Sequence, residues 1–368
     1  MAQKLQHTDY DIAWICALPL ELAAAKSMLD EIHPSLPQAP SDQNSYTLGR
    51  ISGHNIVLVC LPSGTYGTTS AATVLSQMLS TFSSISYGLM VGIGGGIPSR
   101  DRDIRLGDVV VSTPSGISGG VIQYDHGKAL PDKSFETTGS FNRPPPVLLS
   151  AVSQMRSNHM VNCLELQATI AKALQSHKYI KEHFSRPGRD WLFNAAHKHC
   201  TDAIDCSACD KTQLVDRLPR RSHEPRIHYG LIASGNQVIK DAQTRDLISH
   251  RLGGRILCLE MEAAGLMNQL PCLVIRGICD YCDSHKQDDW HGYGALSAAA
   301  YAKVLLTLVP VGARFDRPWV GSEEQAKHYE FNNSGSGSQF NVNGGSQSNN
   351  TGNGNQFFGG FHGPVSFG

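Results

Sequence analysis

The chain has 368 residues, which is enough for one large domain or two. Its formal net charge at pH 7 is −1, so a protein drawn to nucleic acid by bulk electrostatics is excluded as a class. The sequence predicts no membrane span, because no apolar run approaches the roughly 20 residues that a transmembrane helix needs.

The cysteines and the N-terminal residues indicate a reducing compartment. Met1–Asp9 is polar and lacks the apolar core of a signal peptide. Several of the ten cysteines stand inside apolar, strand-like runs, where they are expected to be small buried hydrophobic residues. These are Cys16, Cys60, Cys258 and Cys272. We therefore expect a cytoplasmic protein.

Strands alternate with helices along most of the chain. The run from Tyr10 to Leu18 is apolar almost throughout, as a strand covered on both faces should be, and Pro19 ends it before a helical pattern. The further expected elements, in chain order, are Leu20–Asp30, Tyr46–Ile51, Asn55–Leu61, Ala71–Phe82, Tyr87–Val91, Asp108–Ser112, His228–Ala233, Arg255–Met261, Pro271–Ile278 and Ala295–Val309. This alternation predicts an α/β sandwich with a largely parallel sheet.

Two segments interrupt the alternation and define the expected domains. We predict one catalytic-type domain over 9–318, with an insertion over about 143–226 that borders or covers a site and holds helices at Val147–Arg156, Glu165–His177 and Trp191–His199. A linker over 319–331 and a Gly-, Asn- and Gln-rich tail over 332–368 follow.

The tail contains an imperfect repeat. Gly335-Ser336-Gly337-Ser338-Gln339-Phe340 recurs 17 residues later as Gly352-Asn353-Gly354-Asn355-Gln356-Phe357. Such a segment has too few apolar side chains for a conventional core, but repeated Phe beside Asn and Gln suits stacked cross-β layers. An amyloid-type assembly segment and a flexible linker both remain open, and the matched Phe positions favour assembly.

Glycine and polar clusters follow several of the expected strands. Because ligands of parallel α/β sheets bind at the carboxyl ends of strands, these clusters predict a pocket there. The residues expected to shape it are Ser63, Gly64, Gly92, Gly94, Ser234 and Gly235.

The ordered series of motifs resembles the nucleoside phosphorylase/nucleosidase family over roughly Asp9 to Pro310. The motifs are Ala17-Leu18-Pro19-Leu20-Glu21, Gly92-Ile93-Gly94-Gly95-Gly96, Leu106-Gly107-Asp108-Val109-Val110, Ser234-Gly235, Glu260-Met261-Glu262 and Arg276-Gly277-Ile278-Cys279-Asp280. The resemblance implies a three-layer α/β sandwich with a mixed, largely parallel central sheet, an oligomer, and no cofactor. Tyr124-Asp125-His126-Gly127-Lys128 and Asp283-Ser284-His285-Lys286 are similar to a variant fused to fungal NOD-like receptors, and the tail resembles the amyloid signalling motifs of those systems.

The resemblance implies roles for the residues at the strand ends. Asp280 would be the general acid at N7 of a purine, and burial at a strand end could let it keep its proton near neutral pH. Met261, Glu262 and Arg276 would form the ribose site, with Glu262 accepting both ribose hydroxyls. The plainer interpretations are a structural ion pair for Asp280 and a helix-start acid for Glu262.

Glu21 separates hydrolysis from phosphorolysis. The phosphate-using relatives carry an arginine at this position, whereas a carboxylate resembles the methylthioadenosine/S-adenosylhomocysteine nucleosidases. A carboxylate would repel a phosphate dianion and could instead orient and deprotonate water. We therefore expect an N-ribosyl hydrolase, although a solvent-facing Glu21 at a helix start would mean nothing for catalysis.

The base and the 5′ group are expected on either side of the ribose. Val238 would pack on the base and the backbone of Ile239 would read its edge, which favours adenine. Because relatives in immune systems act on adenine nucleotides, ATP is a candidate substrate that would need cations near the 5′ position. The candidates, each of which could equally be an ordinary surface charge, are Arg100, Arg102, Lys128, Lys240 and Lys286.

A metal site is weighed in the insertion. His199 and the Cys206-x-x-Cys209 pair could ligate zinc, but a second well-spaced pair is missing, so we expect no metal there.

The expected partners follow from these assignments: a purine nucleoside or nucleotide, further copies of the chain, and an upstream NOD-like receptor with a matching amyloid motif. The function expected from the sequence is adenine N-glycosidic hydrolysis as a cell-death effector in fungal innate immunity. Alternatives are a phosphate-dependent purine nucleoside phosphorylase and a non-catalytic nucleotide-sensing module of a signalling fibre.

Overall fold

A computed structural model describes residues 5–99, 101–131, 135–161, 165–200, 205–286 and 288–313. The expected linker, the tail and Arg100 lie outside the described residues.

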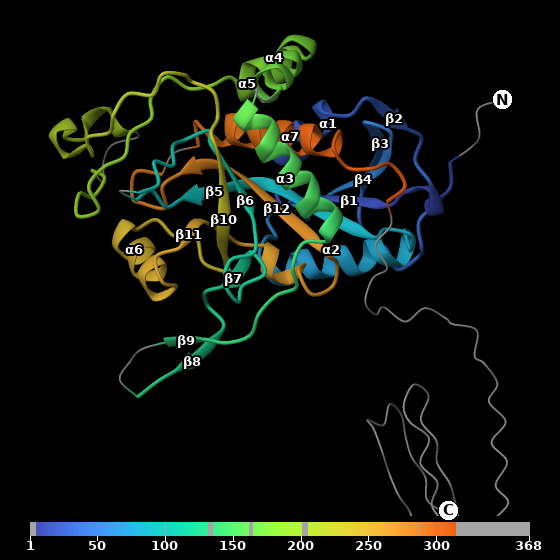
Figure 1. Cartoon of the computed structure of the whole chain (residues 1–368), viewed down its shortest axis with the longest axis horizontal. Coiled ribbons are helices and arrows are strands. Elements are labelled where there is room, and N and C mark those ends of the chain that lie inside the picture. Colours follow the sequence, from blue (N-terminus) through green and yellow to red (C-terminus); the bar gives the residue numbers. More distant parts are fainter. Residues whose placement is uncertain are drawn as a thin grey trace, which may run out of the picture. The chain divides into compact units, whose positions relative to one another are not determined.

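A large mixed sheet runs through the molecule (Figure 1). Its strands are β1 (Ile12–Cys16), β2 (Glu31–His33), β3 (Tyr46–Ile51), β4 (His54–Cys60), β5 (Tyr87–Gly96), β6 (Val109–Ser112), β7 (Val121–Gln123), β10 (Ile227–Ser234), β11 (Ile256–Glu260) and β12 (Cys272–Asp280). The spatial order is β11-β10-β6-β12-β5-β1-β4-β3-β2, with β7 beside β10. The central pairs β4–β1, β1–β5 and β5–β12 are parallel, whereas β12–β6 and the β2–β3–β4 edge are antiparallel. The expected mixed, largely parallel sheet is confirmed.

Helices cover both faces of this sheet, and strand β1 shows why. Its side chains alternate between two cores, with Trp14 on one face and Ala13 and Ile15 on the other, and all are fully buried. Helices α1 (Pro19–Ser27), α3 (Pro146–Val161), α4 (Leu166–Ser176), α5 (Lys178–Phe184) and α7 (His291–Leu306) pack into the first core, and α2 (Thr68–Thr81) packs into the second. The three layers are visible in Figure 1, and α6 (Ala242–Arg251) lies beside β10 and β11.

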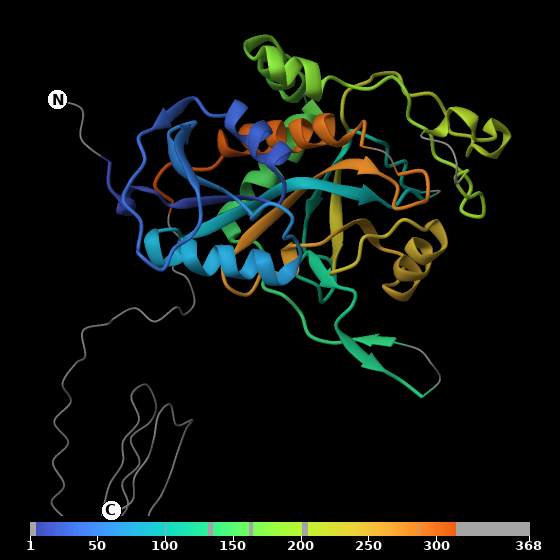
Figure 2. The same cartoon turned by 180° about the vertical axis from the view of Figure 1, so that it is seen from behind.

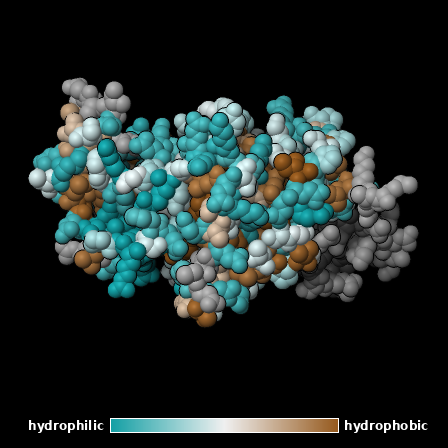
Figure 3. Space-filling model, turned by 90° about the horizontal axis from the view of Figure 1, so that it is seen from above, coloured by the Kyte–Doolittle hydropathy of each residue, from teal (hydrophilic) through white to brown (hydrophobic). Residues whose placement is uncertain are grey.

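The small hairpin of β8 (Gly127–Ala129) and β9 (Phe135–Thr137) projects from this body, as Figure 2 shows from behind. The face seen in Figure 3 mixes hydrophilic and hydrophobic residues. Within the described ranges, no helix is long and apolar enough to cross a membrane.

The segment 143–226 differs in two ways from the predicted insertion: its first part belongs to the main core, and one of its predicted helices is missing. Its first part supplies α3, α4 and α5, whose apolar faces belong to the same core as α7. The expected helix at Trp191–His199 is wrong: this stretch is irregular, and Phe193 packs with Cys206 and Cys209 in a separate small cluster. The short 3₁₀ turns η2 (Cys206–Ala208) and η3 (Lys211–Gln213) follow.

Candidate active site

A cavity of about 350 Å³ opens where β1, β5, β11 and β12 end, a size typical of small-molecule sites. Four carboxyl groups line it from chain positions far apart, and all four residues are less than 10 % exposed. These are Glu21, Glu260, Glu262 and Asp280.

Glu21 is held at the start of α1 by main-chain N–H groups. Pro19 begins the helix and Glu21 occupies its third position, so one carboxylate oxygen (Oε2) accepts from the N–H groups of Ala17 at 2.6 Å and Leu18 at 3.0 Å. The other oxygen (Oε1) accepts at 2.8 Å from the N–H of Ile93 in β5. Burial raises the pKa of Glu21 despite these bonds. The side chain is therefore fixed inside the cavity, which argues against the solvent-facing interpretation.

Gly92 makes room for this arrangement. A Cβ atom at this position would lie 2.3 Å from Glu21 Oε1 and 2.6 Å from Arg276 Nη1, closer than real side chains approach one another. Gly92 therefore lies behind the cavity wall, whereas Gly94 lines the cavity itself.

Arg276 is a fully buried cation shared by three acids. Its Nη2 atom forms a short ion pair with Glu260 and lies 3.3 Å from Glu262 Oε2, while its Nη1 atom is 4.0 Å from Glu21 Oε1. Glu260 also accepts from the N–H groups of Glu262 and Ala263, at 3.1 and 3.0 Å. Glu260 thus orients both Arg276 and the turn that carries Glu262, a role that the sequence did not suggest. Its place in the Glu260-Met261-Glu262 motif was the available signal.

Glu262 follows β11 and points into the cavity. Its Oε1 atom accepts at 3.3 Å from the N–H of Gly67, at the start of α2. Burial, together with the nearby charges of Glu260 and Glu21, raises the pKa of Glu262 to about 7, although Arg276 acts in the opposite direction. The neighbouring Met261 lines the same cavity.

Asp280 ends β12 and is paired with Lys286. The Lys286 Nζ atom lies 2.6 Å from Asp280 Oδ2, and the N–H of Cys282 donates to Oδ1 at 2.8 Å. Burial acts to raise the pKa of Asp280, but the charge and hydrogen bond of Lys286 outweigh it, so the pKa lies below its ordinary value. The expectation that burial would keep Asp280 protonated near neutral pH is therefore wrong.

The remaining predicted residues divide into two groups. Val238, Ile239 and Lys240 line the cavity with Tyr66, which sequence reasoning missed. The others do not line it. Ser63 and Gly64 lie in an exposed loop, Ser234 and Gly235 are buried behind the site, Arg102 donates to the carbonyl of Arg255, and Lys128 is exposed on β8.

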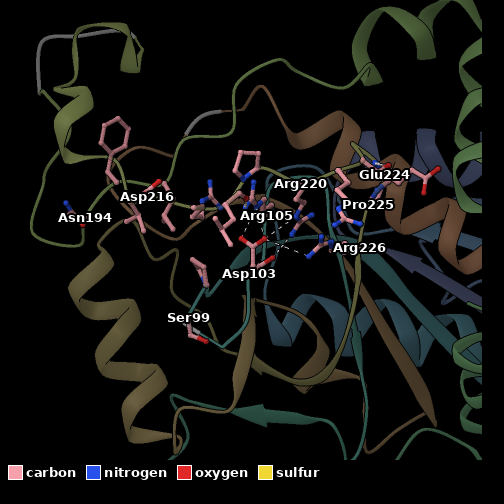
Figure 4. Close-up of a pocket in the computed structure, with 18 of the residues that line it drawn as sticks. Ser99, Asp103, Arg105, Asn194, Asp216, Arg220, Glu224, Pro225 and Arg226 are labelled. Carbon is pink, nitrogen blue, oxygen red and sulfur yellow. Dashed lines mark hydrogen bonds and ion pairs between the residues drawn. The ribbon is translucent and has the colours of Figure 1, made fainter. Parts of the chain in front are cut away.

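A second, larger cavity of about 970 Å³ lies between Asp103 and the segment 192–226 (Figure 4). Two of its arginines are held by acids: Arg105 and Arg220 pair with Asp103, and Arg220 also pairs with the buried Asp108 at 2.6 Å. This region is a structural ion-pair network, and the described residues of 143–226 contribute none of the lining of the carboxylate cavity.

Comparison with known proteins shows the family of the chain. Residues 11–310 match the family model described as the phosphorylase superfamily. The chain belongs to this superfamily. Residues 328–368 match a second model, described as the sigma domain on NACHT-NTPases. The recognised family and the expected fold class are confirmed.

Three relatives illustrate the range of proteins that share this superfamily domain. A nucleotide-binding leucine-rich repeat (NLR)-like protein of Hyaloscypha variabilis is 46 % identical over 83 % of this chain, which spans only 30 % of that relative. A 5′-methylthioadenosine/S-adenosylhomocysteine nucleosidase of Mycobacterium bovis is 24 % identical over 81 % of this chain and 96 % of the relative. The ATP nucleosidase Cap17 of Escherichia coli is 25 % identical over 81 % of this chain and 51 % of its own length.

A solved structure shares the fold. The 5′-methylthioadenosine/S-adenosylhomocysteine nucleosidase of Neisseria meningitidis, in complex with methylthio-immucillin-A, has a TM-score of 0.52 and 15 % identity, over 81 % of this chain and 98 % of that one.

Proposed function

We propose that this protein hydrolyses the N-glycosidic bond of adenine nucleosides or nucleotides. The observation that carries the proposal is the place of Glu21: a buried carboxylate, held by three main-chain N–H groups, in one cavity with Glu262 and Asp280. The nucleosidase relatives support the same reaction class.

The four carboxyl groups suit water better than phosphate as the nucleophile. Of the lysines among the described lining residues, Lys286 is paired with Asp280, and Lys240 is exposed at the rim of the cavity. A phosphate dianion near Glu21 and Glu262 would meet like charges at low dielectric. A neutral water avoids this cost and can give its proton to Glu21.

The ribose would bind over Glu262. In its carboxylate form, Glu262 can accept hydrogen bonds from both ribose hydroxyls, and its charge favours the positive charge that develops on the sugar as the bond breaks. Glu260 and Arg276 keep this side chain in place.

The Asp280–Lys286 pair would supply the proton that adenine needs to leave. Across the neutral range the pair carries one transferable proton, held on the Lys286 ammonium, because the ion pair lowers the pKa of Asp280 and raises that of Lys286. As the glycosidic bond breaks, the Lys286 ammonium gives its proton to Asp280, which passes it to N7, and Lys286 is left neutral until it regains a proton from solvent. Water loses its proton to Glu21 as its oxygen bonds to the anomeric carbon, so a nucleoside gives adenine and ribose, and a nucleotide gives adenine and the ribose 5′-phosphate ester.

The test is adenine release from adenosine and from ATP, each with and without phosphate. The hydrolase would be supported by adenine release that does not depend on phosphate and that yields free ribose or ribose phosphate esters. This release should be lost in Glu21→Gln. The control is Glu182→Gln, because Glu182 is exposed on α5 and remote from the cavity. Release only with phosphate, giving ribose 1-phosphate, would establish a phosphorylase instead. Ligand binding without release would indicate a nucleotide-sensing module.

ATP is the substrate we propose within this class, by likeness to Cap17. Lys240 lines the cavity, is exposed, and forms no ion pair within the described ranges, so it is the cation we assign to the 5′ phosphates. Equal or better turnover of adenosine by the assembled protein would contradict this assignment.

We further propose that the tail recruits the enzyme to an upstream NLR in the cytoplasm and forms amyloid-type fibres. The sigma-domain match over 328–368 and the NLR-like relative support this role. None of the nine described cysteines is in a disulfide, which suits a reducing compartment.

Seeded assembly of the full chain, compared with a chain ending at residue 318, tests the tail. Fibres that need the tail and raise adenine release would support the effector role, and a monomeric full chain at high concentration with seeds would refute it. Light scattering on the shortened chain would test the expected homo-oligomer of the catalytic domain.

A further inference from the structure

Two histidines and two cysteines converge beside the active site, outside the carboxylate cavity. Their possible ligand atoms all lie within 4.8 Å of one another: His199, Cys206, Cys209 and His285. Three of them come from the segment 199–209, and His285 comes from the loop after β12, 76 residues further along the chain from Cys209. Cys206, Cys209 and His285 are all less than 10 % exposed.

The distances among these atoms match a tetrahedral metal site. His285 Nδ1 lies 3.7 Å from the Sγ atoms of both Cys206 and Cys209. With zinc–sulfur bonds of about 2.3 Å and zinc–nitrogen bonds of about 2.0 Å, a tetrahedral ion separates its sulfur and nitrogen ligands by about 3.5 Å. His285 and the two cysteines therefore already stand close to the separation that a shared metal ion requires.

The His285 ring is oriented as a metal ligand would be. Its other nitrogen, Nε2, lies 3.1 Å from the carbonyl oxygen of His197, which makes Nε2 the protonated atom and turns the Nδ1 lone pair toward the sulfurs. The Phe193 ring stacks on it with centroids 3.9 Å apart. Such a hydrogen bond from the second nitrogen is typical of metal-bound histidines.

The Cys-x-x-Cys turn is also built to present both sulfurs. The Asp205 carboxylate accepts from the N–H of Ser207 at 2.9 Å and starts the 3₁₀ turn η2, which the N–H of Cys209 closes on the carbonyl of Cys206 at 3.2 Å. The Lys211 ammonium donates to the carbonyl oxygens of Cys206 and Cys209.

We propose that His199, Cys206, Cys209 and His285 bind a structural zinc ion. Two thiolates and two imidazoles form a neutral complex with Zn²⁺, and this soft, closed ligand set selects zinc over the hard cations Mg²⁺ and Ca²⁺. The absence of a second well-spaced pair in the sequence had argued against a metal. His285, brought in by the fold, completes the set.

The zinc ion would clamp the segment 199–209 onto the loop that carries Lys286. The main chain already joins the two, because the N–H of His199 donates to Ser284 Oγ at 2.9 Å. His285 is the residue next to Lys286, whose ammonium pairs with Asp280. The metal would thus act on the active site by positioning the loop that carries Lys286.

The first experiment measures zinc in the full-length protein, purified without added metal or chelator and after removal of any histidine tag. We expect about one zinc ion per chain, as a closed four-ligand site requires. The double variant Cys206→Ser/Cys209→Ser should lose it. Cys200→Ser is the matched control, because Cys200 is exposed in the same segment and belongs to no cluster, and it should keep the metal. Zinc-free wild-type protein, or zinc retained by the double variant, would overturn the proposal.

A second measurement remains decisive if the double variant fails to fold. Wild-type protein in which cobalt replaces zinc should show the strong d–d absorption of a tetrahedral site and a thiolate-to-cobalt charge-transfer band. An octahedral cobalt spectrum, or a Cys206–Cys209 disulfide found by mass spectrometry in protein prepared under reducing conditions, would overturn the site. Neither readout depends on the proposed reaction, so either proposal can fail alone.

Discussion

Replacing Gly92 with alanine tests whether the position of Glu21 matters. The new Cβ atom would lie 2.3 Å from Glu21 Oε1, whereas ordinary contacts begin at 3.4 Å, so the carboxylate must move by about 1 Å. The hydrogen bond to Ile93 and the approach to Arg276 would both be disturbed. A misplacement of about 1 Å can slow an enzyme about 100-fold, equivalent to about 2.7 kcal/mol in the barrier.

The control lies on the same strand. A Cβ atom at Gly88 would lie 2.8 Å from Cys272 Sγ and 2.9 Å from Leu270 Cδ2, so Gly88→Ala crowds β5 to a similar degree but far from Glu21. Both variants should lose about 1–3 kcal/mol of stability through overpacking. The assay is kcat for adenine release per folded protein, with folding checked by thermal unfolding. A folded Gly92→Ala protein whose kcat stays within about tenfold of Gly88→Ala would refute the role of Glu21.

The remaining predictions concern charge. The pKa of Glu262 is raised to about 7, so its carboxylate form is lost as pH falls through that value. We therefore expect kcat/KM for adenosine to drop about tenfold per pH unit below pH 7. A kcat/KM that stays constant down to pH 5 would contradict this. In Lys286→Met the proton held on Lys286 is gone and Asp280 must carry its own, so release at alkaline pH should fall steeply in the variant and remain steady in the wild type; identical pH profiles would exclude a proton supply through Lys286. Lys240→Met should raise KM for ATP and leave KM for adenosine unchanged, as paired steady-state kinetics would show, and an equal change for both substrates would place the 5′ phosphates elsewhere.

Much of the fold could be predicted from local pattern, because the strands are buried on both faces. The apolar run at Tyr10–Leu18 became β1 (Ile12–Cys16), and Pro19 became the first residue of α1. The helix expected at Trp191–His199 did not form, because Phe193 and His197 pack on His285, a contact that no local pattern reveals.

The site was harder to predict where a side chain's role depends on a contact with a residue far away in the sequence or in another loop. Motif context placed Glu21, Glu262 and Asp280 at strand ends, and the fold brings them into one cavity. Lys286 was considered a phosphate ligand, yet it pairs with Asp280, since a loop returns it to the end of β12. Sequence spacing shows neither that return nor the meeting of His285 with the two cysteines.

The shared position of Arg276 has a consequence for any mutational study of this centre. One guanidinium contacts Glu21, Glu260 and Glu262, and all four groups are almost completely buried. Removing one carboxylate frees the cation to move toward the other two, so the effects of single substitutions should not sum. The same coupling should limit which substitutions evolution tolerates here. A change at one acid should require a compensating change at another, so among related sequences the four residues should vary together or not at all.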